Sequence, residues 1–184
     1  SGNNRTLKRM LRRYTVDMLL EKIDMVRKSI PDIALSTDII VAFPGETDAE
    51  FRDTLDLMRT VRFDEAFTYK YSLRDGTPAT RFPERDIIAS EEAQTRLAEL
   101  IELSRQIQGQ INSSEVGRVE EVLIEHQGRD PGQVRGRTRR NKVVVFDGDV
   151  ERVGDYAHAL LERTTGATFS GSEVAYSKPE MALV

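Results

Sequence analysis

The amino-acid sequence predicts an α/β unit with parallel strands covered by helices, followed by a small all-β barrel of the OB-like type. Up to about residue 112, helical and strand patterns alternate along the chain, as they do where helices cover parallel strands. About five short strands then follow within roughly 60 residues, a spacing typical of small barrels. We therefore expect one domain at residues 1–112, a second at residues 113–176 and a loose tail at residues 177–184.

The stretch STDIIVAFPGETD, residues 36–48, is the centre of the first domain. Residues 39–41 are all apolar, which is typical of a strand covered on both faces. Pro44-Gly45 ends the strand, and Thr47 begins a helix in which Glu50 can complete a capping box. Ligands of α/β folds lie at the carboxyl ends of strands, so this turn is a candidate binding edge. The alternative is an ordinary turn between a strand and a helix.

The other elements of the first domain follow from the same kinds of pattern. Apolar residues at helical spacing predict helices, and an aromatic-rich alternating stretch at residues 63–72 predicts a second strand. The turn-rich loop LRDGTPA follows at residues 73–79. Helices are expected over residues 5–13, 16–30, 48–61 and 90–112, and the first strand over residues 33–42.

The second domain is predicted from short alternating runs separated by turn residues. GRDPG at residues 128–132 and Asp147-Gly148 are turn signals. The strands are expected over residues 116–126, 133–138, 142–146, 155–164 and 168–174.

Composition limits the classes of protein and of site. Hydrophobic residues make up 39% and charged residues 32% of the 184 residues, and no apolar run approaches the ~20 residues of a membrane span. With no signal peptide, a cytoplasmic protein is expected. The net charge of −4 argues against a uniformly basic nucleic-acid binder but permits a local basic patch. Cysteine is absent, which excludes a disulfide or a cysteine-ligated metal in this chain, and the two histidines, His126 and His158, are expected to be structural.

The beginning of the sequence suggests a fragment. It starts at Ser1-Gly2, without Met and without a strand before the first helix. Two strands can neither close a barrel nor make a full sheet, so the amino-terminal part of this domain is expected to be missing. Open strand edges and apolar helix faces would then be uncovered, and we expect the chain to self-associate.

The clearest charge cluster is RGRTRRNK, residues 135–142, in which no acidic residue occurs. On a small barrel such a cluster can contact phosphates, and RNA is favoured over duplex DNA because OB-like barrels bind single strands and loops. Gly136 is expected to let a partner approach the backbone. The alternative is a solvated hairpin. The candidate RNA-binding residues are Arg135, Arg137, Arg139, Arg140 and Lys142.

Two further residues are candidates in the first domain. Arg74 follows the second strand, where its guanidinium could bind a carboxylate or phosphate, although a surface arginine in a turn is the simpler interpretation. Asp38 lies within an apolar strand, so its carboxylate should be paired, hydrogen-bonded or functional unless it lies near solvent. No Ser–His–Asp set, P-loop or paired-carboxylate motif is found in the sequence.

Four segments in register resemble one known family. SGNNRTLKRMLRRYT, STDIIVAFPGET, YSLRDGTPA and GRTRRNKVVVF look like segments of the radical-SAM methylthiotransferases, and the similarity is closest to the MiaB type that modifies tRNA. The resemblance covers nearly the whole chain. It implies that residues 1–112 are the second half of a TIM-like radical-SAM barrel and residues 113–176 an RNA-binding TRAM domain.

The resemblance also implies cofactors, partners and a reaction. S-adenosylmethionine and two 4Fe-4S clusters serve the full-length enzymes, which add a methylthio group to an isopentenyl-modified adenosine of tRNA. The cluster ligands belong to an amino-terminal portion that this cysteine-free chain lacks, so the chain alone is expected to be inactive. Ala42 stands where relatives usually carry Gly. By resemblance, the cofactor-binding positions are Ser1, Asn3, Asp38, Ile40, Tyr71, Ser72 and Arg74.

Two alternative functions remain open at this stage. The first is the sister methylthiotransferase that acts on an aspartate of a ribosomal protein, against which SGNN and the basic segment argue. The second is an RNA-binding module without a catalytic parent, for which the motifs of the first domain would have no purpose.

Overall fold

The computed structural model describes residues 1–175, so the tail expected at residues 177–184 lies outside the described residues. The chain divides into two compact units, Ser1–Gln108 and Gly109–Val184, here called unit 1 and unit 2. Each described strand that the sequence predicted is present, with bounds that differ from the prediction by at most three residues.

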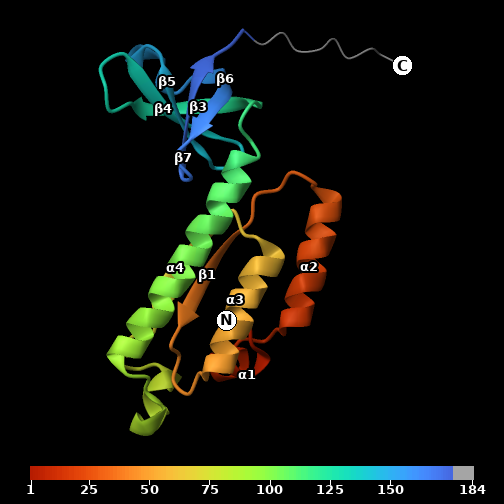
Figure 1. The fold of residues 1–184 in the computed structure, drawn as a ribbon, viewed down its shortest axis with the longest axis vertical. Coiled ribbons are helices and arrows are strands. Elements are labelled where there is room, and N and C mark those ends of the chain that lie inside the picture. Colours follow the sequence, from red (N-terminus) through yellow and green to blue (C-terminus); the bar gives the residue numbers. More distant parts are fainter. Residues whose placement is uncertain (176–184) are drawn as a thin grey trace. The chain divides into compact units, whose positions relative to one another are not determined.

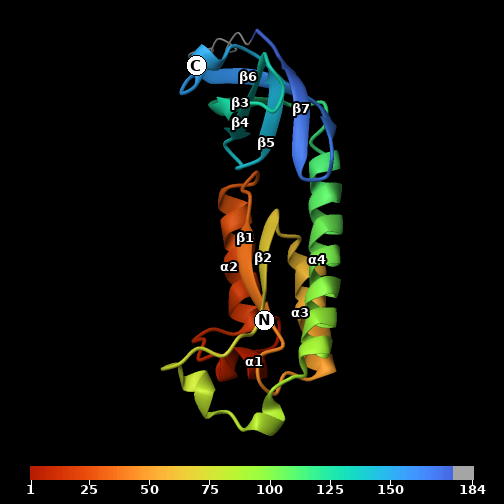
Figure 2. The ribbon, with the colours of Figure 1, turned by 90° about the vertical axis from the view of Figure 1, so that its left-hand side faces the viewer.

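Unit 1 contains a pair of parallel strands with helices alongside (Figures 1 and 2). Strand β1 (Ser36–Val41) pairs with β2 (Glu65–Lys70), with Ser36 opposite Glu65 and Val41 opposite Lys70. Two short 3-10 turns, η1 (Pro78–Arg81) and η2 (Glu84–Asp86), lie in the loop that follows β2. The helices are α1 (Asn4–Arg9), α2 (Val16–Ser29), α3 (Asp48–Val61) and α4 (Ser90–Ser113), the last of which continues into unit 2.

Local structure explains where α3 begins and where α1 ends. The predicted capping box is confirmed, because Thr47 Oγ1 accepts from Glu50 N at 3.3 Å and Glu50 Oε2 accepts from Thr47 N at 2.7 Å. The predicted helix over residues 5–13 is shorter than expected and ends at Arg9. Leu11 there has a φ of 58°, a left-handed conformation that cannot continue an α-helix.

The core of unit 1 is formed by apolar residues of β1, α3 and α4. Ile39 and Val41 alternate with more exposed residues of β1, so one face of the strand is buried. Helix α2 has no buried residue and exposes apolar side chains such as Met25. From α3 the core receives Phe51, Leu55, Leu57, Met58 and Val61.

None of the helices within residues 1–175 is long and apolar enough to cross a membrane.

Unit 2 is a closed five-stranded barrel, which confirms the predicted all-β part of the chain. Its strand order is β3-β4-β5-β7-β6. The parallel pairing of β5 with β7 and the antiparallel pairing of β3 with β6 join the three strands β3-β4-β5 to the β6-β7 hairpin. Alternate residues point inward and form one apolar cluster that includes Val122, Phe146 and Phe169. The elements are β3 (Val119–Gln127), β4 (Gln133–Thr138), β5 (Val143–Asp147), η3 (Val150–Arg152), β6 (Tyr156–Thr164) and β7 (Thr168–Glu173).

Candidate functional site

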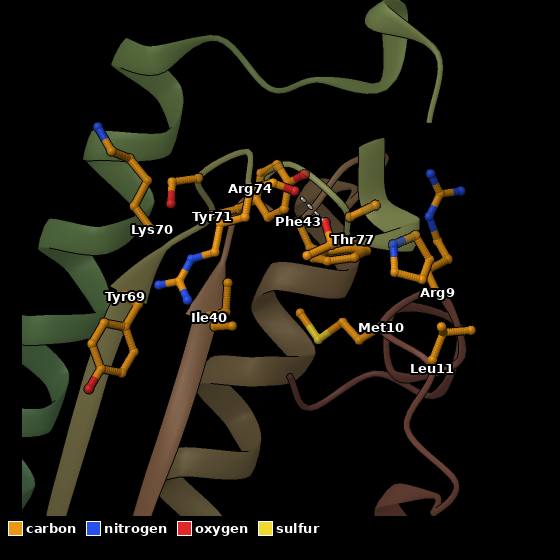
Figure 3. Close-up of a pocket in the computed structure, with 13 residues that line it drawn as sticks. Arg9, Met10, Leu11, Ile40, Phe43, Tyr69, Lys70, Tyr71, Arg74 and Thr77 are labelled. Atoms are coloured by element: carbon orange, nitrogen blue, oxygen red, sulfur yellow. Dashed lines mark hydrogen bonds between the residues drawn. The ribbon is translucent and has the colours of Figure 1, made fainter. Parts of the chain in front are cut away.

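A cavity of about 490 Å³ lies at the carboxyl ends of β1 and β2 (Figure 3). Because the two strands are parallel, their last residues meet at this edge, where α/β folds bind ligands. The cavity collects residues from three segments of unit 1: residues 9–11 at the end of α1, residues 40–43 at the end of β1, and residues 69–79 at the end of β2 and in the loop after it. Its lining is largely apolar and aromatic, with Ile40, Phe43 and Tyr69 among its members.

Four of the residues predicted for the cofactor line this cavity: Ile40, Tyr71, Ser72 and Arg74. Asp38 is on the same face of β1 as Ile40, two residues earlier, but is not part of the lining. The structure therefore brings together the strand-end positions of the prediction.

Ser1 and Asn3 do not line the cavity. Asn3 has a structural task, since its Oδ1 caps α1 and its Nδ2 donates to Asp53 Oδ2 at 2.7 Å. Ser1 Oγ accepts from Asn3 N at 3.2 Å. Gly2 packs against the backbone of Asp53 and Thr54, where a Cβ atom would overlap.

The cavity holds a polar atom without a partner. The Tyr71 hydroxyl is buried and makes no hydrogen bond. The Tyr71 ring packs edge-on against the Phe43 ring, with 5.2 Å between the ring centres. Arg74 is exposed at the rim, and its guanidinium makes no ion pair with any residue in the range 1–175. A buried hydroxyl normally has a hydrogen-bond partner. An aromatic wall, an unpartnered hydroxyl and an unpaired guanidinium together fit a ligand with a flat aromatic part and a carboxylate, as S-adenosylmethionine has.

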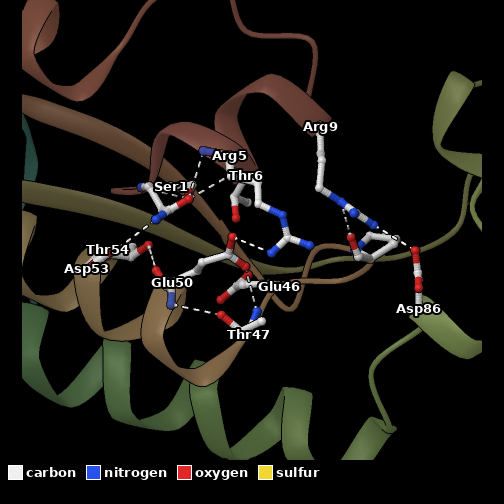
Figure 4. A network of polar contacts seen from close by, with 12 residues as sticks. Ser1, Arg5, Thr6, Arg9, Glu46, Thr47, Glu50, Asp53, Thr54 and Asp86 are labelled. Carbon is white, nitrogen blue, oxygen red and sulfur yellow. Dashed lines mark hydrogen bonds and ion pairs between the residues drawn. The ribbon is translucent and has the colours of Figure 1, made fainter.

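Arg9 is a residue of this cavity that the sequence did not indicate. Its Nε donates to Pro44 O and its Nη2 to Asp86 Oδ2, both at 2.9 Å (Figure 4). Its guanidinium lies 4.6 Å from the centre of the Phe82 ring. Gly45 N in turn donates to Asp86 O at 2.7 Å. One arginine of α1 thus attaches the loop after β2 to the Phe-Pro-Gly turn.

A buried carboxylate lies directly after that turn. Glu46 accepts from Phe43 N through Oε2 at 3.1 Å, and its Oε1 lies 3.4 Å from Arg96 Nη1 of α4. Arg96 also pairs with Asp48 at 2.7 Å and with Glu92. Burial raises the pKa of Glu46 above its usual value, while the hydrogen bond from Phe43 N and the charge of Arg96 act in the opposite direction.

In unit 2 the predicted basic residues fall into two groups. Arg135 and Arg137 point outward from β4, because Val134, Gly136 and Thr138 are the buried, inward-facing positions. Arg135 is exposed and makes no ion pair within the described part of the chain. The other arginines of this outward group are partly engaged: Arg137 with Glu125 at 3.2 Å, and Arg139, which is 83% exposed, with Glu121 at 3.9 Å.

Arg140 and Lys142 belong to the second group, whose side chains are largely withdrawn from solvent. Arg140 Nη1 lies 2.6 Å from the buried carboxylate of Glu115, and Lys142 is itself buried. Gly136 is also buried, and a Cβ atom there would overlap the carbonyl oxygen of Leu123. The glycine therefore serves close packing of β3 and β4, in place of the access for a partner that the sequence suggested.

Comparison with known proteins finds a family match within each of the two units. Residues 1–58 match the radical SAM superfamily, and residues 113–172 match the TRAM domain. Proteins named tRNA-2-methylthio-N(6)-dimethylallyladenosine synthase are similar along most of the chain. That of Thermoanaerobacter sp. (strain X514) is 45% identical over 95% of this chain, and that of Chlorobium luteolum is 44% identical over 94%.

Both units are similar to parts of the radical-SAM methylthiotransferases. The resemblance predicted from the four sequence segments is thereby confirmed. The chain spans 37% of the length of the Thermoanaerobacter relative and 39% of that of the Chlorobium relative. Within residues 1–175 the structure contains no group of three or more His, Cys, Asp or Glu side chains that could hold a metal ion.

Proposed function

We propose that this chain is part of a tRNA methylthiotransferase that adds a methylthio group to a dimethylallyl-modified adenosine of tRNA. The observation that carries this proposal is the similarity to synthases of that name along both units, with 45% identity over 177 residues. Those names specify a tRNA adenosine, which favours this reaction over modification of a ribosomal protein. The two units have different roles: unit 1 carries a small-molecule site, and unit 2 carries an RNA-binding surface.

Unit 1 supplies part of the S-adenosylmethionine site. The cavity at the ends of β1 and β2 offers Tyr71, whose buried hydroxyl has no partner, and Arg74, whose guanidinium suits a carboxylate. Ser72 and Ile40 line the same cavity. In this family the bound cofactor and its iron–sulfur cluster supply radical chemistry. The chain's own residues bind the cofactor, orient it and exclude water from it.

The proposed architecture is half of a TIM-like radical-SAM barrel at residues 1–112 followed by a TRAM domain at residues 113–176. An amino-terminal portion of the same protein would complete the barrel and provide cysteines for two 4Fe-4S clusters, since cysteine is absent here. The partners would thus be tRNA and that portion, and the compartment the cytoplasm. Ser1, Asn3 and Asp38, which do not line the cavity, remain proposed cofactor positions.

Unit 2 binds tRNA through exposed arginines. Arg135 carries a charge that no acidic side chain in the described range neutralises, and the Arg139 side chain is 83% exposed. Arg137 can add a third contact if it exchanges Glu125 for a phosphate. Arg140 and Lys142, although part of the predicted set, would act on RNA only indirectly, by holding the shape of the hairpin.

The test is tRNA binding by the 184-residue chain at several salt concentrations, with Arg135 and Arg139 changed together to Ala. Losing two phosphate contacts should weaken binding and reduce the slope of log K against log salt by between about 1.4 and 1.8. The matched control changes Lys28 and Arg59 to Ala, which removes two exposed charges of unit 1. Equal effects of both double variants, or no binding by the unchanged chain, would contradict the proposal.

A further inference from the structure

The outer face of the barrel carries an exposed tyrosine that its core does not use. Tyr156 begins β6 and is 64% exposed, whereas Ala157, Ala159 and Leu161 of the same strand point inward. Because side chains alternate along a strand, the Tyr156 ring lies on the outer face of the barrel. No hydrogen bond or ring contact joins its side chain to another residue within 1–175.

Strand register places this tyrosine next to the basic surface. Leu123 of β3 is paired with Tyr156 on one side and with Arg137 of β4 on the other. Neighbouring strands lie about 4.8 Å apart, so the backbones of Tyr156 and Arg137 are about 10 Å apart with an aliphatic side chain between them. Arg135 lies on the same face, two residues along β4, or about 7 Å from Arg137.

The charges on this surface favour an anionic partner. Glu125 and Glu121 of β3 are engaged by Arg137 and Arg139, which leaves the charge of Arg135 uncompensated. A flat ring on the same face as an unpaired guanidinium matches the two parts of a nucleotide, because the base can stack on the ring while a neighbouring phosphate contacts the arginine.

We propose that the surface formed by Tyr156, Leu123, Arg135 and Arg137, the outer-face platform, binds an unpaired nucleobase of RNA. The base stacks on the Tyr156 ring, and the phosphates next to it contact the two arginines. An unpaired base is required, because a base within a duplex has no free face to offer. This inference rests on the proposed tRNA binding by unit 2 and adds the kind of nucleotide that is bound.

Three substitutions at one position test the platform. Tyr156→Ala and Tyr156→Leu should each weaken tRNA binding by about 5- to 150-fold, the range for loss of one base–aromatic stack, and Tyr156→Phe should bind as the unchanged chain does. The salt slope should stay the same in all three, since no charge is lost. Binding of a fully paired RNA duplex should not change. Because Tyr156 is exposed, the variants should fold, which circular dichroism can verify.

The outcomes separate this inference from the proposed function. If the unchanged chain binds tRNA through Arg135 and Arg139 but Tyr156→Ala binds equally well, the platform is overturned and the proposed function stands. If Tyr156→Leu retains full affinity while Tyr156→Ala does not, the contact is aliphatic, as with a protein segment, and base stacking is overturned. If the unchanged chain binds no tRNA, both proposals fall together.

Discussion

Arg140 Nη1 lies 2.6 Å from Oε1 of Glu115, and the two side chains are only 19% and 3% exposed. The pair connects the hairpin between β4 and β5 to the segment that leads from α4 into the barrel. A buried carboxylate without a partner is costly, so Arg140 is needed where it lies. Arg140 is therefore a structural arginine, whereas other arginines of the same basic segment are exposed. The sequence alone does not distinguish the two kinds.

Changing Arg140 to Ala should lower the free energy of unfolding of the barrel by about 3 kcal/mol, because it leaves Glu115 buried and uncompensated. Arg135→Ala should change that free energy by no more than about 0.5 kcal/mol, since its side chain is exposed. Urea unfolding followed by circular dichroism measures both. Adding Glu115→Gln to Arg140→Ala should recover part of the loss, and a double variant as unstable as Arg140→Ala would argue against the ion pair as the cause.

The buried Glu46 should make stability depend on pH in a defined direction. Its pKa is raised on folding, chiefly by burial, so the unfolded chain ionises first as the pH rises. The contribution of Glu46 to stability is therefore fully present below its unfolded pKa of about 4.5 and is lost as the pH rises through its folded pKa. Each pH unit between the two pKa values costs about 1.4 kcal/mol.

The measurement is the free energy of unfolding of the unchanged chain and of Glu46→Gln at a series of pH values. Because Gln does not ionise, the stability of the unchanged chain relative to the variant should decrease as the pH rises from below 4.5. Other carboxylates titrate in both proteins and cancel in the difference. A relative stability that increases with pH would show that Arg96 outweighs burial at this site.

Local signals account for what the sequence predicted well. The capping box of Thr47 and Glu50 and the bounds of α3 and β4 follow from residues next to each other in the chain. The ends of α1 were predicted less well, since its last turn is replaced by a left-handed Leu11. No helix-ending glycine or proline marks that position in the sequence.

Tertiary contacts account for what the sequence did not predict. The participation of Arg9 depends on Asp86, which is 77 residues away, and the different roles of Arg135 and Arg140 depend on where Glu115 lies. Gly136 was expected to admit a partner, but it faces inward from β4 and packs against the backbone carbonyl of Leu123. Charge composition identified the cluster, whereas only register and burial decide which of its members face solvent.

Arg9 should hold the loop after β2 in place. Changing it to Ala removes the hydrogen bonds to Pro44 O and Asp86 and the contact with Phe82, so the loop should open more often. Limited digestion with trypsin should then cleave faster after Arg81 and Arg85. Arg9→Lys should protect only partly, because a lysine cannot make both hydrogen bonds in the same geometry. Arg5→Ala, which removes the partly exposed pair with Glu50, is the control and should leave cleavage unchanged.

Changing Ala42 to Gly should lower the free energy of unfolding less than the same change does at a comparable alanine. Its φ is 57°, and a left-handed conformation costs a residue with a Cβ atom about 1–2 kcal/mol. Ala42→Gly relieves that strain but loses a buried methyl group, worth about 0.8 kcal/mol, and increases the entropy of the unfolded chain, worth about 0.5–1 kcal/mol. These terms nearly cancel, so the free energy of unfolding should change by less than about 0.5 kcal/mol.

Ala93 of α4 is the matched control, because it is 4% exposed like Ala42 but lies inside a helix. Ala93→Gly loses a methyl group of the same kind and gains no relief of strain, so it should destabilise the protein by about 1.5–2 kcal/mol. The difference between the two variants measures the strain at the end of β1. Equal losses would mean that the turn before Phe43 relaxes around the alanine and that its left-handed conformation stores no strain.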